Sequence, residues 1–401
     1  MIETALISVP SRACDSIFGR PLLERLLLLC TREGINRFII ETGSVERAEV
    51  ARALGSFAER PEVKLVDSFR RVAPDGDGLA SDAASIAFRG NLVLARSQLR
   101  RAMAAYAAAP SQRLRVVSTD ADRGGTIELG PLATLLSDPA SAAGDILNSR
   151  GYLPFALNGR PQDRQEAELR LARSIRAESV ATDAPLAQLV DRRLSWRISY
   201  RLARIGVTPN QVTLANTALG MLCATLFAST SYWLRLAGAL LFLLSITIDG
   251  VDGELARLRM VESEAGARLD VFTDNMVHVA VFIGLLVGCY RVSHDRAYFW
   301  LLGLLLGGFG ACAVSVNRAL RTADDGAEEW FHRVERATGR DFAYLLVALA
   351  IFDRLAWFAW ATAFGAWIFA AGLWWLTDRR RTRGDAPKRG PARKGLVKEE
   401  L

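Results

Sequence analysis

The second half of the chain contains long apolar runs, and these limit what the protein can fold into. Five stretches are almost wholly apolar: residues 212–228, 234–248, 271–289, 298–316 and 342–376. A helix needs roughly 20 mainly apolar residues to cross the hydrocarbon core of a bilayer. The runs therefore predict a polytopic α-helical membrane domain.

The last run predicts two helices rather than one. It is too long for a single span, and Asp353 and Arg354 interrupt it, which favours a hairpin that turns near Asp353. About six transmembrane helices result, and an even number puts both termini on one side. Because residues 379–398 are strongly basic, we expect that side to be cytoplasmic.

The first half of the chain is more charged and has a different periodicity. We expect strands at residues 5–9, 38–41, 63–66, 92–95 and 114–118, and helices at 22–32, 45–54 and 97–107. Such alternation predicts a cytosolic α/β domain with a parallel sheet covered by helices on both faces. The expected domains are 1–150 (α/β), 151–190 (helical linker), 191–378 (juxtamembrane helix and six-helix membrane domain) and 379–401 (basic disordered tail).

Four carboxylates lie at the edges of two apolar runs. Asp249 and Asp252 follow the second run and are three residues apart, whereas Asp270 and Asp274 frame the start of the third and are four apart. On helices each pair shares one face, and a short loop between the helices brings the pairs together. Ionisable groups at a membrane edge are costly and are by default functional, although the alternative of plain polar helix ends stays open.

The residue types around the carboxylates indicate a metal and phosphate site. Four uncompensated carboxylates would repel one another, so they imply divalent cations, and hard oxygen ligands without Cys or His favour Mg²⁺ or Mn²⁺ over zinc. Gly253 leaves room for a phosphate near the backbone and Ala256 keeps the next turn thin, while Arg257 offers a guanidinium to phosphate oxygens.

The whole pattern reads D-x-x-D-G-x-x-A-R-x8-G-x3-D-x3-D from Asp249 to Asp274. It resembles the signature of the CDP-alcohol phosphotransferases, membrane enzymes that move a phosphate-bearing group from a CDP-alcohol to a second alcohol and release CMP. The resemblance implies two metals held by Asp249, Asp252 and Asp270, with Asp274 completing the cluster and acting as general base. It further implies that the cytidine nucleotide pocket is lined by Asp252, Gly253, Ala256, Arg257 and Gly266.

A second stretch supports the same family. Residues 206–213 resemble the family's entry into its first transmembrane helix, where Pro209 follows Thr208 and can begin a helix. Upstream, residues 191–205 place apolar side chains on one face and arginines around the rest. This pattern predicts a helix on an anionic membrane surface, or else an ordinary solvated basic helix.

The N-terminal half resembles a sugar nucleotidyltransferase that has lost key positions. The phrase from Gly19 to Arg25, together with residues 34–40, is similar to the start of that fold. However, the loop at residues 10–16 has no glycine to wrap phosphates, and Asn91 stands where the family has a metal-binding aspartate. We therefore expect a degenerate domain without cytidylyl transfer activity.

These observations predict an integral membrane phosphotransferase of phospholipid biosynthesis. The expected donor is a CDP-alcohol, most simply CDP-diacylglycerol, and the acceptor is an alcohol or alcohol phosphate. Two alternatives are transfer between a soluble CDP-polyol and a polyol phosphate, and a non-enzymatic membrane scaffold. The net charge of +7 reflects topology rather than nucleic acid binding. Gly303 and Gly307 favour close helix packing, in a homodimer or within one protomer.

Overall fold

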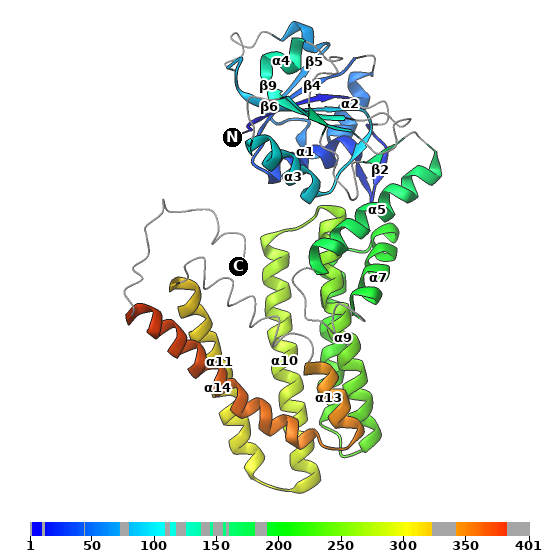
Figure 1. Ribbon diagram of the computed structural model, residues 1–401. Helices are drawn as coiled ribbons and strands as arrows, with labels where there is room; N and C mark the ends of the chain where they lie inside the picture. Colours follow the sequence, from blue (N-terminus) through cyan, green and yellow to red (C-terminus); the bar gives the residue numbers. More distant parts are fainter. Residues whose placement is uncertain are drawn as a thin grey trace. The chain divides into compact units, whose positions relative to one another are not determined.

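The structure is a computed structural model that describes residues 2–9, 13–43, 45–72, 80–108, 113–117, 126–137, 145–146, 155–157, 160–180, 191–322 and 342–382. Two compact units make up the chain. The first comprises Met1–Glu178, Leu202–Gly206 and Arg257–Val261, and the second comprises Ser179–Arg201, Val207–Ala256 and Glu262–Leu401. The fold class is confirmed, because an α/β sheet forms the N-terminal part and helices form the C-terminal part (Figure 1).

The first unit is organised around one mixed sheet. Among the described residues its order is β10-β8-β9-β6-β1-β4-β5. The strands are β1 (Thr4–Ser8), β4 (Arg37–Glu41), β5 (Val63–Val66), β6 (Ala84–Arg89), β8 (Leu114–Val117), β9 (Thr126–Pro131) and β10 (Asp145–Ile146). β1 pairs in parallel with β4 and β6, whereas β9 is antiparallel to both β6 and β8. The expected all-parallel sheet is therefore wrong at β9.

The difference has a chain-length reason. Only residues 118–125 connect β8 to β9, and a parallel crossover needs a dozen residues or more. The predicted strand at 92–95 is also misplaced, because β7 (Leu92–Val93) pairs instead with β11 (Phe155–Ala156) in a separate small sheet. β6 takes the position beside β1, although Ser85 and its alanines make it look less apolar than the stretch that follows.

Helices cover both faces of the sheet. They are α1 (Leu22–Arg32), α2 (Arg47–Leu54), α3 (Arg96–Ala108) and α4 (Leu132–Ser137). The first unit also contains a short β2–β3 hairpin (Ser16–Ile17, Arg20–Pro21) before α1 and the long helix α5 (Pro161–Val180). Alternating side chains of β1 enter different cores: Ile7 packs with Leu23 and Leu27 of α1, and Leu6 packs with Leu132 and Leu135 of α4. This is the layered arrangement that the strand and helix periodicities predict.

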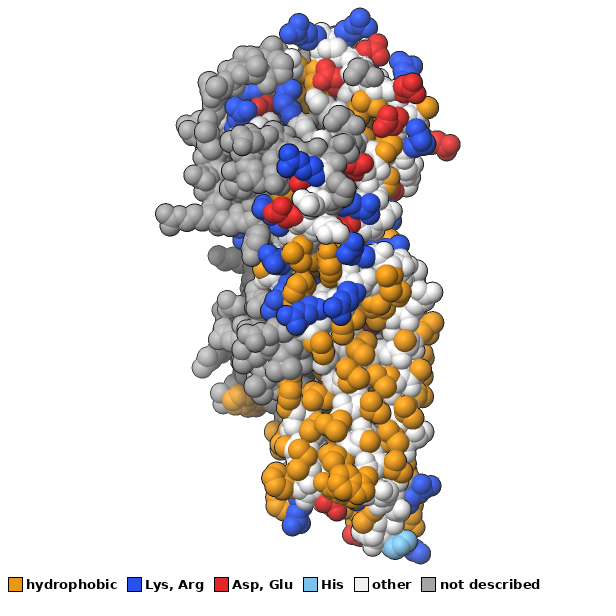
Figure 2. Space-filling view, turned by 90° about the vertical axis from the view of Figure 1, so that its right-hand side faces the viewer, with side chains coloured by type: hydrophobic (Ala, Val, Ile, Leu, Met, Phe, Trp, Pro, Cys, Tyr) orange, Lys and Arg blue, Asp and Glu red, His pale blue; other side chains and the backbone are white. Residues whose placement is uncertain are grey.

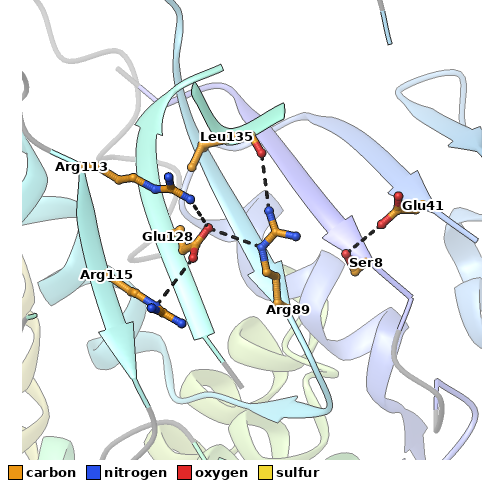
Figure 3. Close-up of polar contacts among 7 residues, drawn as sticks. All are labelled: Ser8, Glu41, Arg89, Arg113, Arg115, Glu128 and Leu135. Carbon is orange, nitrogen blue, oxygen red and sulfur yellow. Dashed lines mark hydrogen bonds and ion pairs between the residues drawn. The ribbon is translucent and has the colours of Figure 1, made fainter. Parts of the chain in front are cut away.

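A buried carboxylate joins three strands of this sheet. Glu128 on β9 lies among Arg113, Arg115 and Arg89 (Figure 3). Its carboxylate is 3.0 Å from the guanidinium of Arg113, 3.4 Å from that of Arg89 and 3.7 Å from that of Arg115. Arg89 also donates to the Leu135 carbonyl at 3.4 Å. One acid thus compensates a group of cations at the antiparallel side of the sheet.

We predict that Glu128→Ala strongly destabilises the first unit. Removal of one partner from a buried ion pair leaves the other charges uncompensated, which costs about 3–5 kcal/mol. The full-length protein should show a lower Tm and a lower yield, whereas the control Glu59→Ala, an exposed acid of the same unit, should leave both unchanged. Equal Tm values for the two variants would contradict this role for Glu128.

The C-terminal helices are α7 (Asp191–Ile205), α8 (Pro209–Phe227), α9 (Tyr232–Arg259), α10 (Glu264–Ser293), α11 (Ala297–Thr322), α13 (Phe342–Ile351) and α14 (Leu355–Thr382). Within the described ranges, four helices are long and apolar enough to cross a membrane: α9, α10, Ala297–Arg318 of α11 and Leu355–Trp375 of α14. Hydrophobic side chains cover the visible helical face in Figure 2. α8 and α13 lie at the two other expected positions, and the count of six spans stays a prediction.

The close crossing of α8 and α10 depends on glycines. A Cβ on Gly284 would lie 2.1 Å from the Ala224 carbonyl oxygen, and one on Gly288 would lie 2.0 Å from that of Phe227. No larger residue fits between these backbones. The helix that carries Asp270 and Asp274 is therefore pressed directly against the first apolar helix of the domain.

Glycines of α11 serve packing within the chain. A Cβ on Gly307 would lie 3.1 Å from the ring of Trp367, and one on Gly308 would lie 2.8 Å from the Ala366 Cβ, both on α14. Trp367 also donates to the Leu304 carbonyl at 2.8 Å. A Cβ on Gly303 would meet no atom within 4 Å among the described residues. Of the predicted pair, Gly307 therefore packs within the chain, whereas the surface of α11 at Gly303 is not covered by the described residues.

Candidate functional site

The predicted carboxylates come together where α9 meets α10. Carboxylate oxygens of Asp249, Asp270 and Asp274 all lie within 4.8 Å of one another. α9 ends at Arg259 and α10 begins at Glu264, with Ser263 accepting a hydrogen bond from the Gly266 amide as its N-cap. The short connection thus folds the two helices back on one another, and the acids meet about two to three turns from it, as the spacing predicts.

Asp252 is held by a hydrogen bond from α8. Its side chain is buried and accepts a short hydrogen bond from the Thr213 hydroxyl of α8 and one of 2.6 Å from the Gly253 amide. It also lies within hydrogen-bonding reach of Asp270. Asp252 therefore stands next to the three-carboxylate group, and α8 fixes its orientation.

The donor set fits divalent cations. Three carboxylates within 4.8 Å repel one another unless positive charge lies between them, and carboxylate oxygens are the ligands that Mg²⁺ and Mn²⁺ accept. Three or four acids from two rigid helices can also hold two cations side by side. The residues present are thus of the right kind, number and spacing for the metals that the sequence predicts.

The other motif residues leave space beside the acids. Gly253 is exposed, and a Cβ there would meet no atom within 4 Å, so a ligand can approach the backbone of α9 closely. A Cβ on Gly266 would lie 3.1 Å from the Ser263 hydroxyl and 3.5 Å from the Asn210 side chain. Ala256 is half-buried and Arg257 is exposed. These features are compatible with the predicted nucleotide contacts, which stay a prediction.

Thr208 to Thr213 begin α8 in the way the sequence predicts. Thr208 and Gln211 form a reciprocal capping box, and Pro209 occupies the first turn. Thr213, one turn later, then reaches Asp252. The sequence predicts this helix entry, but it does not reveal that Thr213 holds a motif carboxylate.

A further acid of the motif, Glu254, was missed as well. It is buried and accepts hydrogen bonds from Ser195 at 3.1 Å and Ser199 at 2.7 Å, both on α7. The two serines are four residues apart and so share one face of α7. On the other side, Leu194 is exposed, which leaves apolar surface available to a membrane. The sequence contained one sign of this contact, because Ser195 and Ser199 are small polar residues on one face of an otherwise arginine-rich helix.

The last turn of α9 is capped by arginines of the first unit. Arg25 donates to the Leu258 carbonyl at 2.6 Å, and Arg20 donates to the Arg259 carbonyl at 2.8 Å. Terminal helix carbonyls lack intrahelical partners and carry partial negative charge, which cationic donors satisfy. Met260, just beyond, is buried in the core of the α/β unit. The stretch Gly19–Arg25 therefore has a structural role at the end of the motif helix.

Asn91 has a structural role too. Its side-chain amide donates to the Leu157 carbonyl at 2.9 Å, and the Leu157 amide donates to the Asn91 carbonyl at 2.8 Å. These bonds fix the β7–β11 pairing. Residues 10–12 of the glycine-free loop lie outside the described residues, and the loss of nucleotidyl transfer stays a prediction.

Comparison with known proteins supports the geometry. A family model described as CDP-alcohol phosphatidyltransferase matches residues 206–377. The inner membrane protein YnjF of Escherichia coli is 32% identical over 203 residues, which cover 48% of this chain and 93% of YnjF. The chain belongs to the CDP-alcohol phosphatidyltransferase family. With its four long apolar helices, it is an integral membrane protein.

Other relatives match over shorter regions. The bifunctional IPC transferase and DIPP synthase of Rubrobacter xylanophilus is 41% identical over 125 residues, 31% of this chain and 28% of the relative. The archaetidylinositol phosphate synthase of Pyrococcus horikoshii is 33% identical over 119 residues, 29% of this chain and 60% of the relative. The match thus spans only 28% to 34% of the length of the first bifunctional relatives.

We predict that Glu254→Ala loosens α7 and lowers stability. The change removes the carboxylate acceptor of two buried hydroxyls. Ser199 can still donate to the Ser195 carbonyl at 2.9 Å, whereas the Ser195 hydroxyl loses its acceptor, and an unsatisfied buried group costs about 1–3 kcal/mol. Thermal unfolding in lipid nanodiscs should show a lower Tm. Glu254→Gln, which can still accept from one serine, should recover part of the loss.

The control is Glu264→Ala on the first turn of α10, because this acid is exposed and only forms a surface pair with Arg268. If Glu254→Ala and Glu264→Ala unfold at the same temperature, the link from Glu254 to α7 contributes nothing measurable.

Proposed function

We propose that the protein transfers a phosphate-bearing group from a CDP-alcohol to an acceptor alcohol and releases CMP. The observation that carries this proposal is the group of Asp249, Asp270 and Asp274, with Asp252 beside it, in a complete family signature. Family membership supplies the reaction class, and the donor set supplies the means to bind a diphosphate.

In this mechanism Asp249, Asp252 and Asp270 would hold two divalent cations, with Asp274 completing the cluster. The cations, Mg²⁺ or Mn²⁺, supply positive charge that neutralises the donor diphosphate and the departing CMP. Asp274 accepts the proton of the acceptor hydroxyl. The acceptor oxygen then bonds to phosphorus as the bond from phosphorus to the CMP oxygen breaks.

The surroundings of the acids support this division of roles. Thr213 and the Gly253 amide already hydrogen-bond Asp252, so that carboxylate is held in one orientation. Gly253 leaves the adjacent backbone open to a nucleotide, and Arg257 adds an exposed guanidinium for phosphate oxygens.

A lipid donor is the simplest substrate for a site at the end of membrane helices, and CDP-diacylglycerol fits that description. Relatives named archaetidylinositol phosphate synthase and phosphatidylinositol phosphate synthase favour an inositol phosphate as the acceptor class. The positive tail at residues 379–398 favours a cytoplasmic site and cytoplasmic termini. A homodimer remains part of the proposal.

The activity test compares donors and acceptors. Purified protein in nanodiscs is given Mg²⁺ or Mn²⁺ with labelled CDP-diacylglycerol or a CDP-polyol, and with inositol, inositol phosphate or glycerol phosphate. CMP release that depends on CDP-diacylglycerol and one acceptor supports the proposal. Turnover only with the CDP-polyol favours the soluble alternative, and no turnover with any pair favours a scaffold.

We predict that Asp270→Asn abolishes transfer while the protein stays folded and membrane-inserted. Loss of one charged ligand should cost at least about a hundredfold, since changes behind metal ligands already cost 10–100-fold. CMP release is the readout, and Glu264→Gln on the same helix is the control. Wild-type turnover in excess chelator would sink the metal assignment.

We predict that Asp274→Asn lowers turnover far more than donor affinity. A general base acts after the donor is bound and contributes about 10²–10⁴-fold. The variant should therefore bind CDP-diacylglycerol nearly as the wild type does, yet form little product. Collapse of donor affinity with near-normal residual turnover is the result that rules out this role.

A further inference from the structure

A cavity of about 570 Å³ lies in the first unit, away from its sheet. It is bordered by the hairpin before α1, by the start of α5, and by the two short segments Leu202–Gly206 and Arg257–Val261. All its lining residues belong to this one unit. None of them belongs to the carboxylate group described above.

The cavity carries a surplus of positive charge. Among the described residues, four arginines line it, Arg160, Arg164, Arg204 and Arg259, together with two acids, Asp15 and Glu168. Because guanidinium groups stay ionised, this surplus persists at all physiological pH values. Such a wall suits an anion with several oxygens rather than a cation or an apolar ligand.

One buried acid holds two of the arginines in place. The Glu168 carboxylate is 3.2 Å from the Arg164 guanidinium and 3.6 Å from that of Arg204. It also accepts a hydrogen bond of 3.4 Å from the Phe18 backbone amide. Its side chain is only 3% exposed, whereas those of Arg164 and Arg204 are 52% and 46% exposed. A single carboxylate thus orients two guanidiniums that both keep exposed surface.

Arg259 is also oriented by the protein. It donates to the Gly206 carbonyl at 2.9 Å. A Cβ on Gly19 would lie 3.9 Å from the same guanidinium, and Gly19 has a φ of +80° that disfavours any side chain. The wall opposite Arg259 therefore stays bare backbone, which leaves room beside the cation.

We propose that this cavity binds the phosphate group of a soluble, hydroxylated phosphomonoester. Planar guanidiniums pair bidentately with phosphate oxygens, and oriented ones lose little freedom on binding. The volume exceeds that of a phosphate ion and accommodates a polyol or sugar attached to it. Gln165 and Asp15 line the same cavity and offer hydrogen bonds to hydroxyls. The α/β unit thereby acts as a binding module for a phosphate ester.

The test is binding by the full-length protein in phosphatidylcholine nanodiscs with chelator present, so that no metal bridges the ligand to the carboxylate group. Inorganic phosphate and inositol 1-phosphate are titrated calorimetrically. Arg164→Gln and Arg204→Gln should each weaken binding of inositol 1-phosphate by about tenfold or more, since a charged hydrogen bond is lost. The control Arg173→Gln changes an exposed arginine of α5 outside the cavity and should bind as the wild type does.

The remaining arms separate this site from other sources of binding. Asp270→Asn should leave the affinity unchanged, whereas a loss in that variant would place the phosphate at the carboxylate group and overturn the proposal. Equal binding by all arginine variants, with their Tm values unchanged, overturns it too. So does an arginine-dependent signal seen only with phosphatidylglycerol in the disc, because the ligand is then a lipid headgroup.

Discussion

The mutual repulsion of carboxylates is the constraint that shapes the membrane domain. Asp249, Asp270 and Asp274 lie within 4.8 Å of one another, so the helices that carry them must hold like charges together wherever cations do not compensate the repulsion. The supports are two long helices on a short connection, a third helix whose Thr213 holds Asp252, and glycines that press that third helix onto α10.

Periodicity and spacing predicted the parts of the structure that depend on local sequence. The acids fall where helix geometry puts them, because residues three and four apart share a face whatever the surroundings. The helix start at Thr208 and Pro209 and the helix break near Asp353 are equally local. The antiparallel direction of β9 was missed because strand direction depends on pairing and connection length rather than on the strand's own residues.

The contacts that fix the site were harder to predict than the site itself. Glu254 resembles any acid in a variable motif position, and Ser195 resembles any helix-surface serine, until the tertiary fold buries them together. Likewise, Arg25 and Asn91 stand in stretches that resemble a nucleotidyltransferase, yet both now bind main-chain carbonyls. Residue type predicts that a group needs a partner, and only the fold selects which one.

The hydrogen bonds from Arg20 and Arg25 to the end of α9 limit how the protein could lose its α/β part during evolution. The helix that carries Asp249 and Asp252 ends in carbonyls satisfied by Arg20 and Arg25, more than 200 positions earlier in the chain. A descendant that lost the α/β part would expose those carbonyls and Met260 at once, so the split would need simultaneous repair at the end of α9. Removal of the α/β part from this chain is therefore expected to require compensating changes at the end of α9, namely new donors for these carbonyls and a polar residue in place of Met260.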